Sequence, residues 1–386
     1  MAENLNLVLK SSKILSNIDS SMKIKKVRNY GVDLIRILAM YGIVFNHLYN
    51  KQKILIKYQG YKELKLFHIF LFWHNNGFAF ISGFIGYKTH KYSNLLYLWV
   101  CVSFYSVTIY LLYLKFNPQV VMDEKLYHNL FPIIFERYWF FTAYFGMYLY
   151  LPIVNKGIAY LNKLELKICI ISIITLLVFW HDIMNIKTDV FKLNGGLSVL
   201  WLLTFFITGS YFGKYKINYF GIRKYIFCFM NFLIFISSSF LYYKIYHYEI
   251  NDLKGNKFAL TLKNLLTECY DSNLKVVQSI SVILLLLQIN YNDNLGKIIS
   301  FIGIKVFGVY LLHDNNYIRV NIINHLLDNE KNNISLFLVF KVFLTKSLLI
   351  FIVCITIDYL RNFLFNLFKI KKFCIFLEKK ICRIKN

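Results

Sequence analysis

The chain has 386 residues, of which 57% are hydrophobic and 19% aromatic, and its mean hydropathy is +0.48. Soluble domains have an apolar fraction nearer to about half, so this composition argues against a soluble protein and predicts a membrane protein. The formal net charge is +25, but Lys and Arg lie mainly between the apolar runs and at the two ends, without a basic and aromatic groove motif. This distribution favours anionic lipid head groups as the partner and argues against nucleic acid.

Apolar runs recur along the chain at about the 20-residue length that crosses a bilayer core of about 30 Å. With only three prolines and 17 glycines, they predict an all-α, polytopic bundle of about ten transmembrane helices rather than a β-barrel. Spans 31–50 and 298–318 contain polar groups that lipid does not tolerate, so we expect these two inside the bundle. The predicted spans are 31–50, 67–87, 95–114, 137–155, 167–184, 197–213, 224–246, 274–290, 298–318 and 334–358.

Two basic segments flank the predicted transmembrane domain of residues 31–358. Residues 1–30 lack the apolar stretch and cleavage site of a signal peptide, so the first span is the expected insertion signal. Residues 361–386 repeat Phe, Leu and Ile at three- and four-residue steps between lysines, which is typical of a helix lying among the lipid head groups. An even number of spans puts both ends on one side, and the excess of basic residues there predicts that both are cytoplasmic, in the inner or plasma membrane.

The seven cysteines are scattered, and none forms a CxxC pair. This spacing predicts neither a disulfide framework nor a metal site. We also expect no tightly bound cofactor.

The first span carries the clearest candidate for chemistry, because it places Arg36 and His47 eleven residues apart. On a helix, eleven steps rotate the chain by about 20° more than three full turns and rise by about 16.5 Å, so both side chains share one face. A charge inside a span costs about 2.5–3.5 kcal/mol on insertion scales, so this face needs a polar interior. The alternative is that Arg36 reaches the inner head groups and His47 caps the outer end of the helix.

Several blocks support this candidate in a fixed order, and together they resemble the acyltransferase-3 group of bacterial membrane O-acyltransferases, in particular polysaccharide O-acetyltransferases. The resemblance covers most of residues 30 to 360, and its signature is an Arg and a His separated by ten residues, here Arg36 and His47. The supporting blocks are NNGFAFISGFIGYK (75–88), YWFFTAYFGMYLYLPIVN (138–155), LWLLTFFITGSYFG (200–213) and FGVYLLHDNN (307–316).

This resemblance implies transfer of an acyl group, with acetyl the expected one, from cytoplasmic acyl-CoA to a hydroxyl of a surface polysaccharide or its lipid-linked precursor. It implies that His47 is essential and that Arg36 supports donor binding or catalysis. A sugar hydroxyl needs a base, and histidine, with an unperturbed pKa of about 6.5, suits this task. His47 could instead accept the acyl group itself. At about 16.5 Å from His47, Arg36 is better placed to hold coenzyme A than to stabilise the reacting carbonyl.

Five further side chains are the candidates for lining the acceptor and thioester pocket. For three of them a structural role is equally open: an interfacial anchor for Trp139, core packing for Tyr144 and a small-residue helix contact for Ser82. We expect His313 and Asp314 not to pair with each other, since neighbours on a helix point about 100° apart. The five candidates are Asn75, Ser82, Trp139, Tyr144 and His313.

A transporter or flippase for a surface-polymer precursor is the alternative function. In such a protein Arg36, His47 and His313 would line an alternating-access path. The sequence shows no internal repeat, and few prolines lie near the spans that would have to break. A structural membrane subunit without chemistry would leave the charged residues inside the spans unexplained. The acyltransferase is therefore the preferred interpretation.

Overall fold

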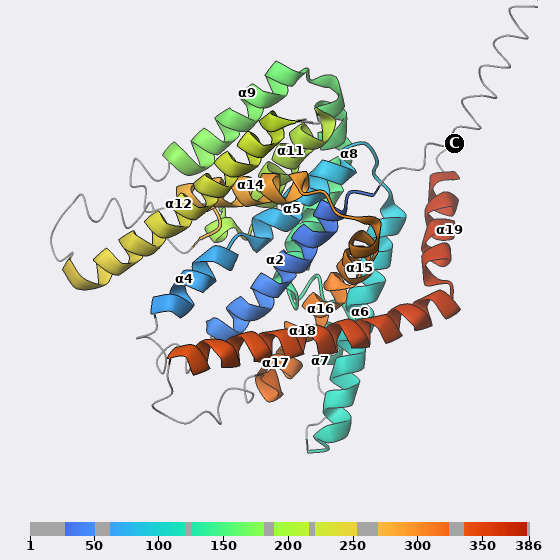
Figure 1. The fold of residues 1–386 in the computed structure, drawn as a ribbon. Helices are drawn as coiled ribbons and strands as arrows, with labels where there is room; N and C mark the ends of the chain where they lie inside the picture. Colours follow the sequence, from blue (N-terminus) through green and yellow to red (C-terminus); the bar gives the residue numbers. More distant parts are fainter. Residues whose placement is uncertain are drawn as a thin grey trace, which may run out of the picture.

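The computed structural model describes residues 28–50, 62–119, 125–180, 189–215, 221–252, 269–323 and 336–383. Within these ranges the chain forms helices and connecting turns but no strand, which confirms the all-α prediction. Figure 1 shows the helices packed at different tilts around α2 (Tyr30–Tyr49), which runs through the middle of the bundle. The predicted basic segment 1–30 lies outside the described residues except for its last three.

The other elements follow α2 in chain order. They are α4 (Lys62–Leu71), α5 (His74–Gly86), α6 (Tyr92–Phe116), α7 (Lys125–Leu130), α8 (Trp139–Tyr160), α9 (Lys163–Ile174), a π-helical turn (Thr175–Trp180), a 3-10 turn (Asn194–Gly196), α11 (Val199–Lys214), α12 (Ile222–Asp252), α14 (Asn273–Gln288), α15 (Asp293–Gly303), α16 (Val306–His313), α17 (Asn316–Asn321), α18 (Leu336–Leu367) and α19 (Ile370–Arg383).

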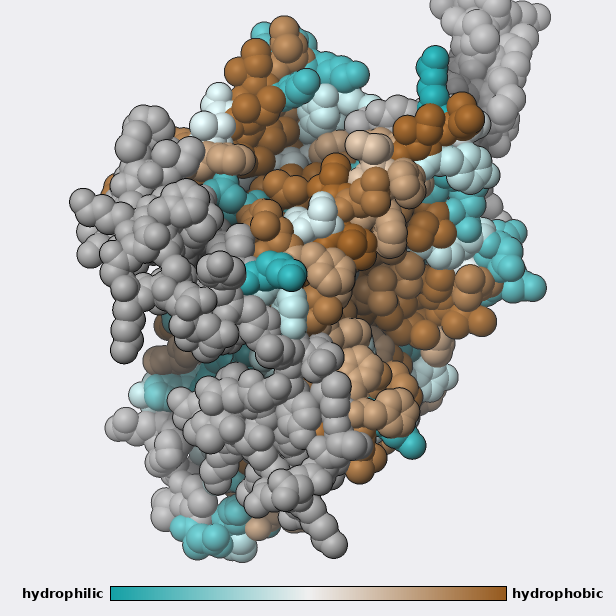
Figure 2. Space-filling model, turned by 60° about the vertical axis from the view of Figure 1, so that its left-hand side comes forward, coloured by the Kyte–Doolittle hydropathy of each residue, from teal (hydrophilic) through white to brown (hydrophobic). Residues whose placement is uncertain are grey.

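Five stretches of helix in the described ranges are long and apolar enough to cross a membrane. Figure 2 shows apolar side chains over the middle of one face, with hydrophilic side chains mainly toward its edges. Exposed apolar surface on this scale suits contact with lipid tails, and the chain is accordingly a multi-pass membrane protein. The five stretches are Tyr30–Tyr49, Tyr92–Phe116, Ile222–Lys244, Asp293–His313 and Phe337–Leu367.

All ten predicted spans overlap helices. Five of them overlap helices that are shorter or less apolar than a membrane crossing requires. The number ten and the cytoplasmic position of both ends therefore stay predictions. The expectation that spans 31–50 and 298–318 lie inside the bundle is confirmed. Buried residues make up 67% of the most apolar part of Tyr30–Tyr49 and 56% of that of Asp293–His313. The corresponding shares in the other three stretches are 39%, 22% and 33%.

The prediction of one continuous helix over 67–87 is wrong, because the chain turns at Phe72–Trp73 between α4 and α5. Trp73 has φ −122° and ψ 1°, outside the helical region. The turn directs the ring of Phe72 onto Tyr270, with ring centroids 4.4 Å apart and planes inclined by 7°. This stacking contact belongs to the tertiary packing, which the apolar run alone does not encode.

The single helix predicted over 298–318 is also wrong, since α15, α16 and α17 occupy this range as three separate helices. Lys305 lies at the first interruption, where its ammonium donates a hydrogen bond to the carbonyl of Phe301 (2.8 Å) and lies over the ring of the same residue. The second interruption comes directly after His313. Each break lies beside a polar side chain, and the first one interrupts the apolar stretch Asp293–His313 without dividing it into separate spans.

The central helix α2 joins two apolar cores. Its first half, including Ile35 and Ala39, packs into a cluster with side chains of α5, α8, α11 and α14. Its second half, including Val44 and Phe45, packs into a cluster with side chains of α6, α16 and α18. All four of these α2 side chains are almost fully buried. The polar residues of α2 are therefore held between two rigid groups of helices.

Helices α5 and α11 approach each other closely at three glycines, Gly83, Gly209 and Gly213. A Cβ atom on Gly83 would clash with the carbonyl of Phe206, and one on Gly209 would clash with the carbonyl of Phe80. The hydroxyl of Ser210 donates to the carbonyl of Gly83 across the same contact (3.3 Å). Small residues at a crossing let two helix backbones touch, which is the usual way to bind helices together in lipid. Gly83 is thus the close-contact residue that α5 contributes to this crossing.

The last two helices enclose the side of the bundle formed by α6. α18 continues to Leu367, past the predicted end of the transmembrane domain, and α19 then packs on α6 with Cys374 fully buried. Inside this region Asp358 accepts hydrogen bonds from Arg361 (2.6 Å) and from the hydroxyl of Tyr105 on α6 (2.8 Å). The hydrogen bond from Tyr105 thus links this buried ion pair of α18 to α6.

Candidate active site

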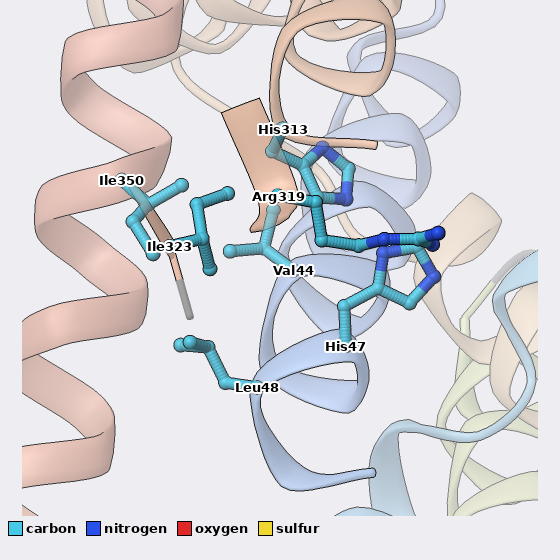
Figure 3. A pocket seen from close by; sticks show the side chains of 7 residues that line it. All are labelled: Val44, His47, Leu48, His313, Arg319, Ile323 and Ile350. Carbon is cyan, nitrogen blue, oxygen red and sulfur yellow. The ribbon is translucent and has the colours of Figure 1, made fainter. Parts of the chain in front are cut away.

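His47 lies in the last turn of α2, where a small cavity opens between α2, α16, α17 and α18. Figure 3 shows His47 and His313 entering this cavity from α2 and α16, with the Arg319 side chain beside them. The cavity has a volume of about 10 Å³, which is room for about one water molecule. Its lining residues are Val44, His47, Leu48, His313, Arg319, Ile323 and Ile350.

Asp314, the residue that follows α16, is the acidic group beside His47. Its Oδ1 atom lies 3.6 Å from Nδ1 of His47, and the carboxylate side chain is only 7% exposed. A carboxylate accepts hydrogen bonds, so it favours the form of His47 that carries its proton on Nδ1 and has a free lone pair on Nε2. The separation exceeds a hydrogen bond, but such catalytic contacts are often long without substrate. Asp314 is therefore the carboxylate that faces Nδ1 of His47, an atom without a hydrogen-bond partner among the described residues.

His313 lies next to His47, with ring centroids 5.1 Å apart. Its Nδ1 atom is 2.7 Å from the carbonyl oxygen of Val309, one turn earlier in α16. Because a carbonyl can only accept, Nδ1 carries the proton and Nε2 has a lone pair. This Nε2 atom is buried and has no hydrogen-bond partner among the described residues. The predicted position of His313 in the polar interior is in agreement with this geometry, and its ring faces the cavity as an acceptor.

Arg319 of α17 completes the polar lining. Its Nη1 atom lies 3.3 Å from Oδ1 of Asp314, the same atom that faces His47. Nη2 lies 3.4 Å from Oδ1 of Asn316. The Arg319 side chain is 46% exposed, so the guanidinium lies at the rim of the cavity rather than in its floor.

A buried hydrogen-bonded bridge fixes the end of α16, which carries these groups. The hydroxyl of Tyr138, just before α8, donates to the carbonyl of Leu311 (3.0 Å) and accepts from Nδ2 of Asn315 (2.9 Å). Oδ1 of Asn315 in turn accepts from the backbone N–H of Tyr317 at the start of α17 (3.0 Å). One tyrosine hydroxyl thereby sets the positions of both helices that contribute to the cavity.

Replacing Tyr138 with phenylalanine is expected to lower both stability and turnover. The change leaves the carbonyl of Leu311 and the amide of Asn315 without their shared partner, and an unsatisfied buried group costs about 1–3 kcal/mol. We expect a lower melting temperature and a reduced kcat with little change in KM for acyl-CoA, measured on purified protein. Tyr113→Phe, on α6 outside the cavity, is the control. An unchanged kcat in Tyr138→Phe would show that the bridge does not position the site.

Arg36 lies three turns away from this cavity and does not line it. Its Nη1 atom is 2.7 Å from Oδ1 of Asp33, a buried carboxylate that also binds Nε of Arg28 (2.6 Å). α2 is continuous from Arg36 to His47, so the two are about 16.5 Å apart along the axis. This agrees with the prediction that Arg36 cannot reach the group on which His47 acts.

Two of the other predicted residues lie at the level of Arg36. The hydroxyl of Tyr144 lies near that of Ser82 and within electrostatic range of Arg36. The hydroxyl of Ser82 also donates to the carbonyl of Phe78 (2.8 Å). Ser82 and Tyr144 therefore form one group with Arg36, and neither is a lining residue of the His47 cavity.

His74 and Asn75 lie at an intermediate level of α2. A Cβ atom on Gly42, about midway between Arg36 and His47, would be 3.4 Å from Cδ2 of His74. Nδ1 of His74 is 3.0 Å from Oδ1 of Asn75, while the buried Nδ2 of Asn75 has no hydrogen-bond partner in the described part of the chain. Polar side chains thus accompany α2 at three successive levels.

The remaining candidate, Trp139, begins α8 and is half-buried against the ring of Phe140. The sequence-based hypothesis placed it in the pocket, but it is not among the lining residues of the His47 cavity. The neighbouring Tyr138 instead makes the hydrogen bonds to Leu311 and Asn315 beside the cavity. Sequence reasoning also missed Asp314 as the partner of His47, although the run of polar residues after Leu312 was a visible signal.

Within the described ranges no group of three His, Cys, Asp or Glu residues is arranged to hold a metal ion. The polar groups at His47 are instead two imidazoles, one carboxylate and one guanidinium. This set can remove a proton, orient the base and stabilise negative charge, which are the requirements of acyl transfer.

The comparison with known proteins agrees with this chemistry. No curated protein and no solved structure matches the chain with significance. A family model described as an acyltransferase domain matches residues 29–359, which contain every residue of the site. The chain is therefore an acyltransferase and belongs to the acyltransferase-3 family.

Proposed function

We propose that this acyltransferase moves an acyl group, with acetyl the expected one, from acyl-CoA to a hydroxyl of a cell-surface polysaccharide or of its lipid-linked precursor. The observation that carries the proposal is the Asp314–His47 pair at a cavity, which supplies an oriented base to a hydroxyl nucleophile. The preference for a surface glycan rests on the resemblance of several sequence blocks to polysaccharide O-acetyltransferases.

In the proposed reaction the acceptor hydroxyl attacks the thioester carbonyl while its proton passes to Nε2 of His47. Asp314 stabilises the resulting imidazolium through Nδ1, as the third member of a nucleophile, base and carboxylate arrangement. The tetrahedral intermediate then expels the thiolate of coenzyme A, and His47 returns the proton to this sulfur. The ester and free coenzyme A leave, and His47 is again neutral.

The three levels of polar groups along α2 support a path for the donor. Arg36, with Ser82 and Tyr144 beside it, would hold phosphate or amide groups of coenzyme A by charge-assisted hydrogen bonds. The thioester arm would then extend along α2, past His74 and toward His47. With both ends of the chain in the cytoplasm, this path would lead from the inner face of the plasma membrane to an acceptor near the outer face.

The first test is the O-acetyl content of the surface polysaccharide in a strain from which the gene is deleted. Complementation with the wild-type gene is expected to restore ester-linked acetate, while Arg36→Ala is expected to restore little, because the donor loses its anchoring cation. Release of acetate by mild base followed by chromatography measures the effect, with membrane levels checked by blot.

Arg223→Ala, which changes an exposed arginine at the start of α12, is the matched control and is expected to complement fully. Acetate that does not depend on the gene would contradict the proposed function. If export of the polymer depended on it instead, a transporter function would replace the proposal.

A further inference from the structure

The proposed transfer creates a negative charge that needs a hydrogen-bond donor beside His47. When the hydroxyl attacks, the carbonyl double bond becomes a single bond and its oxygen becomes an oxyanion. Donors that face this oxygen are commonly the largest contribution to acyl-transfer catalysis. The donor must lie in the cavity where the carbonyl meets the base.

Four of the seven lining residues are aliphatic and cannot donate a hydrogen bond. His47 is the base of the proposed reaction, so its Nε2 atom must accept a proton when the hydroxyl attacks and cannot donate to the oxyanion. His313 is excluded by its own contact, because its Nδ1–H is held by the carbonyl of Val309 and its Nε2 is an acceptor. Arg36 is excluded by its distance along α2 of about 16.5 Å.

We propose that Arg319 is a catalytic residue that stabilises this oxyanion. Among the described residues that line the cavity, it is the one whose side chain has N–H groups to spare for a ligand, and it carries a permanent charge. The inference rests on the proposed acyl transfer and assigns a role within it.

The position of Arg319 suits this role. Its Nη1 atom and Nδ1 of His47 approach the same oxygen of Asp314, so the guanidinium is held beside the imidazole, as Figure 3 shows. Its two contacts, at 3.3 and 3.4 Å, are longer than a strong charge-assisted hydrogen bond, and a planar guanidinium has five N–H donors. Arg319 can therefore keep one N–H on Asp314 and direct another at the carbonyl oxygen.

In the complete step, the hydroxyl oxygen bonds to the carbonyl carbon, the hydroxyl proton moves to His47, and the former carbonyl oxygen accepts a hydrogen bond from Arg319. When the carbon–sulfur bond breaks, the oxyanion electrons reform the double bond and the thiolate takes the proton from His47. No redox partner or further reactant is required.

The test uses the full-length protein in detergent, with radiolabelled acetyl-CoA as donor and surface polysaccharide from the source strain, de-O-acetylated with mild alkali, as acceptor. Arg319→Gln is expected to lower kcat by about 10²–10³-fold, the usual effect of losing one oxyanion donor. KM for acetyl-CoA is expected to change less than threefold, taken as a rough bound, since the donor is held elsewhere along α2. Arg319→Lys, which keeps the charge, is expected to retain more activity than Arg319→Gln. Val320→Ala, on the same helix outside the cavity, is the folding control and is expected to behave as wild type.

A double-mutant cycle separates the proposal from an indirect role through Asp314. If Arg319 acts on the oxyanion, adding Arg319→Gln to Asp314→Asn is expected to cause at least about a further tenfold loss of kcat. If Arg319 acts only by holding Asp314, the double variant will equal Asp314→Asn alone, and the proposal is overturned. An unchanged kcat in Arg319→Gln overturns it as well. Failure of the wild-type protein to transfer label would instead refute the proposed function itself.

Discussion

Replacing His47 with glutamine is expected to lower kcat for acyl transfer by about 10²–10⁴-fold, the usual contribution of a general base. Glutamine keeps a side chain of similar size at the end of α2 but cannot take up a proton. KM for acetyl-CoA should change little, because the proposed donor anchor at Arg36 is unaffected. Initial rates with purified protein, labelled acetyl-CoA and de-O-acetylated polysaccharide measure the effect.

The matched control is His128→Gln on α7, which lies outside the cavity and is expected to keep wild-type activity. A His47→Gln protein that is normally folded and retains more than a tenth of the wild-type kcat would contradict the assignment of His47 as the base. Melting temperature and gel filtration establish whether the variant is folded.

Replacing Gly83 with leucine is expected to prevent normal assembly of the bundle. The backbones of α5 and α11 touch at this glycine, so a side chain there would clash with the carbonyl of Phe206 and separate the helices. Overpacking of this kind costs about 1–3 kcal/mol or more, because neighbouring helices cannot all move away. We expect a strong decrease in membrane level and in melting temperature.

Gly157→Leu provides the comparison, since no atom of the described residues lies within 4 Å of a Cβ atom on Gly157 in α8. It is expected to accumulate and melt as wild type does. Equal membrane levels and melting temperatures for the Gly83 and Gly157 variants would show that the α5–α11 crossing is not essential for assembly.

The helical architecture was predictable because a lipid environment leaves few options. Each apolar run predicted a helix, and the polar groups in the first and ninth spans correctly predicted their burial. The breaks at Phe72–Trp73 and at Lys305 were not predictable, since neither site contains a proline and both lie within a long, mainly apolar run. They depend on contacts with residues far away in the sequence, such as the stacking of Phe72 on Tyr270.

The site was predictable where one helix sets the geometry and less so where two helices meet. The common face of Arg36 and His47 follows from helix periodicity alone. His313 and Asp314 do not pair with each other, as expected for neighbours on a helix. The same expectation offered no partner for Asp314. Its partner, His47, comes from a segment more than 260 residues earlier, and sequence spacing contains no information on such a contact.

The cavity beside His47 has room for about one water molecule, which has a kinetic consequence. The sugar and the thioester of the proposed reaction cannot enter together unless the rim residues move apart, so each turnover of that reaction would include an opening and a closing step. The rate of this movement would then set an upper limit on kcat, however fast the chemical step is.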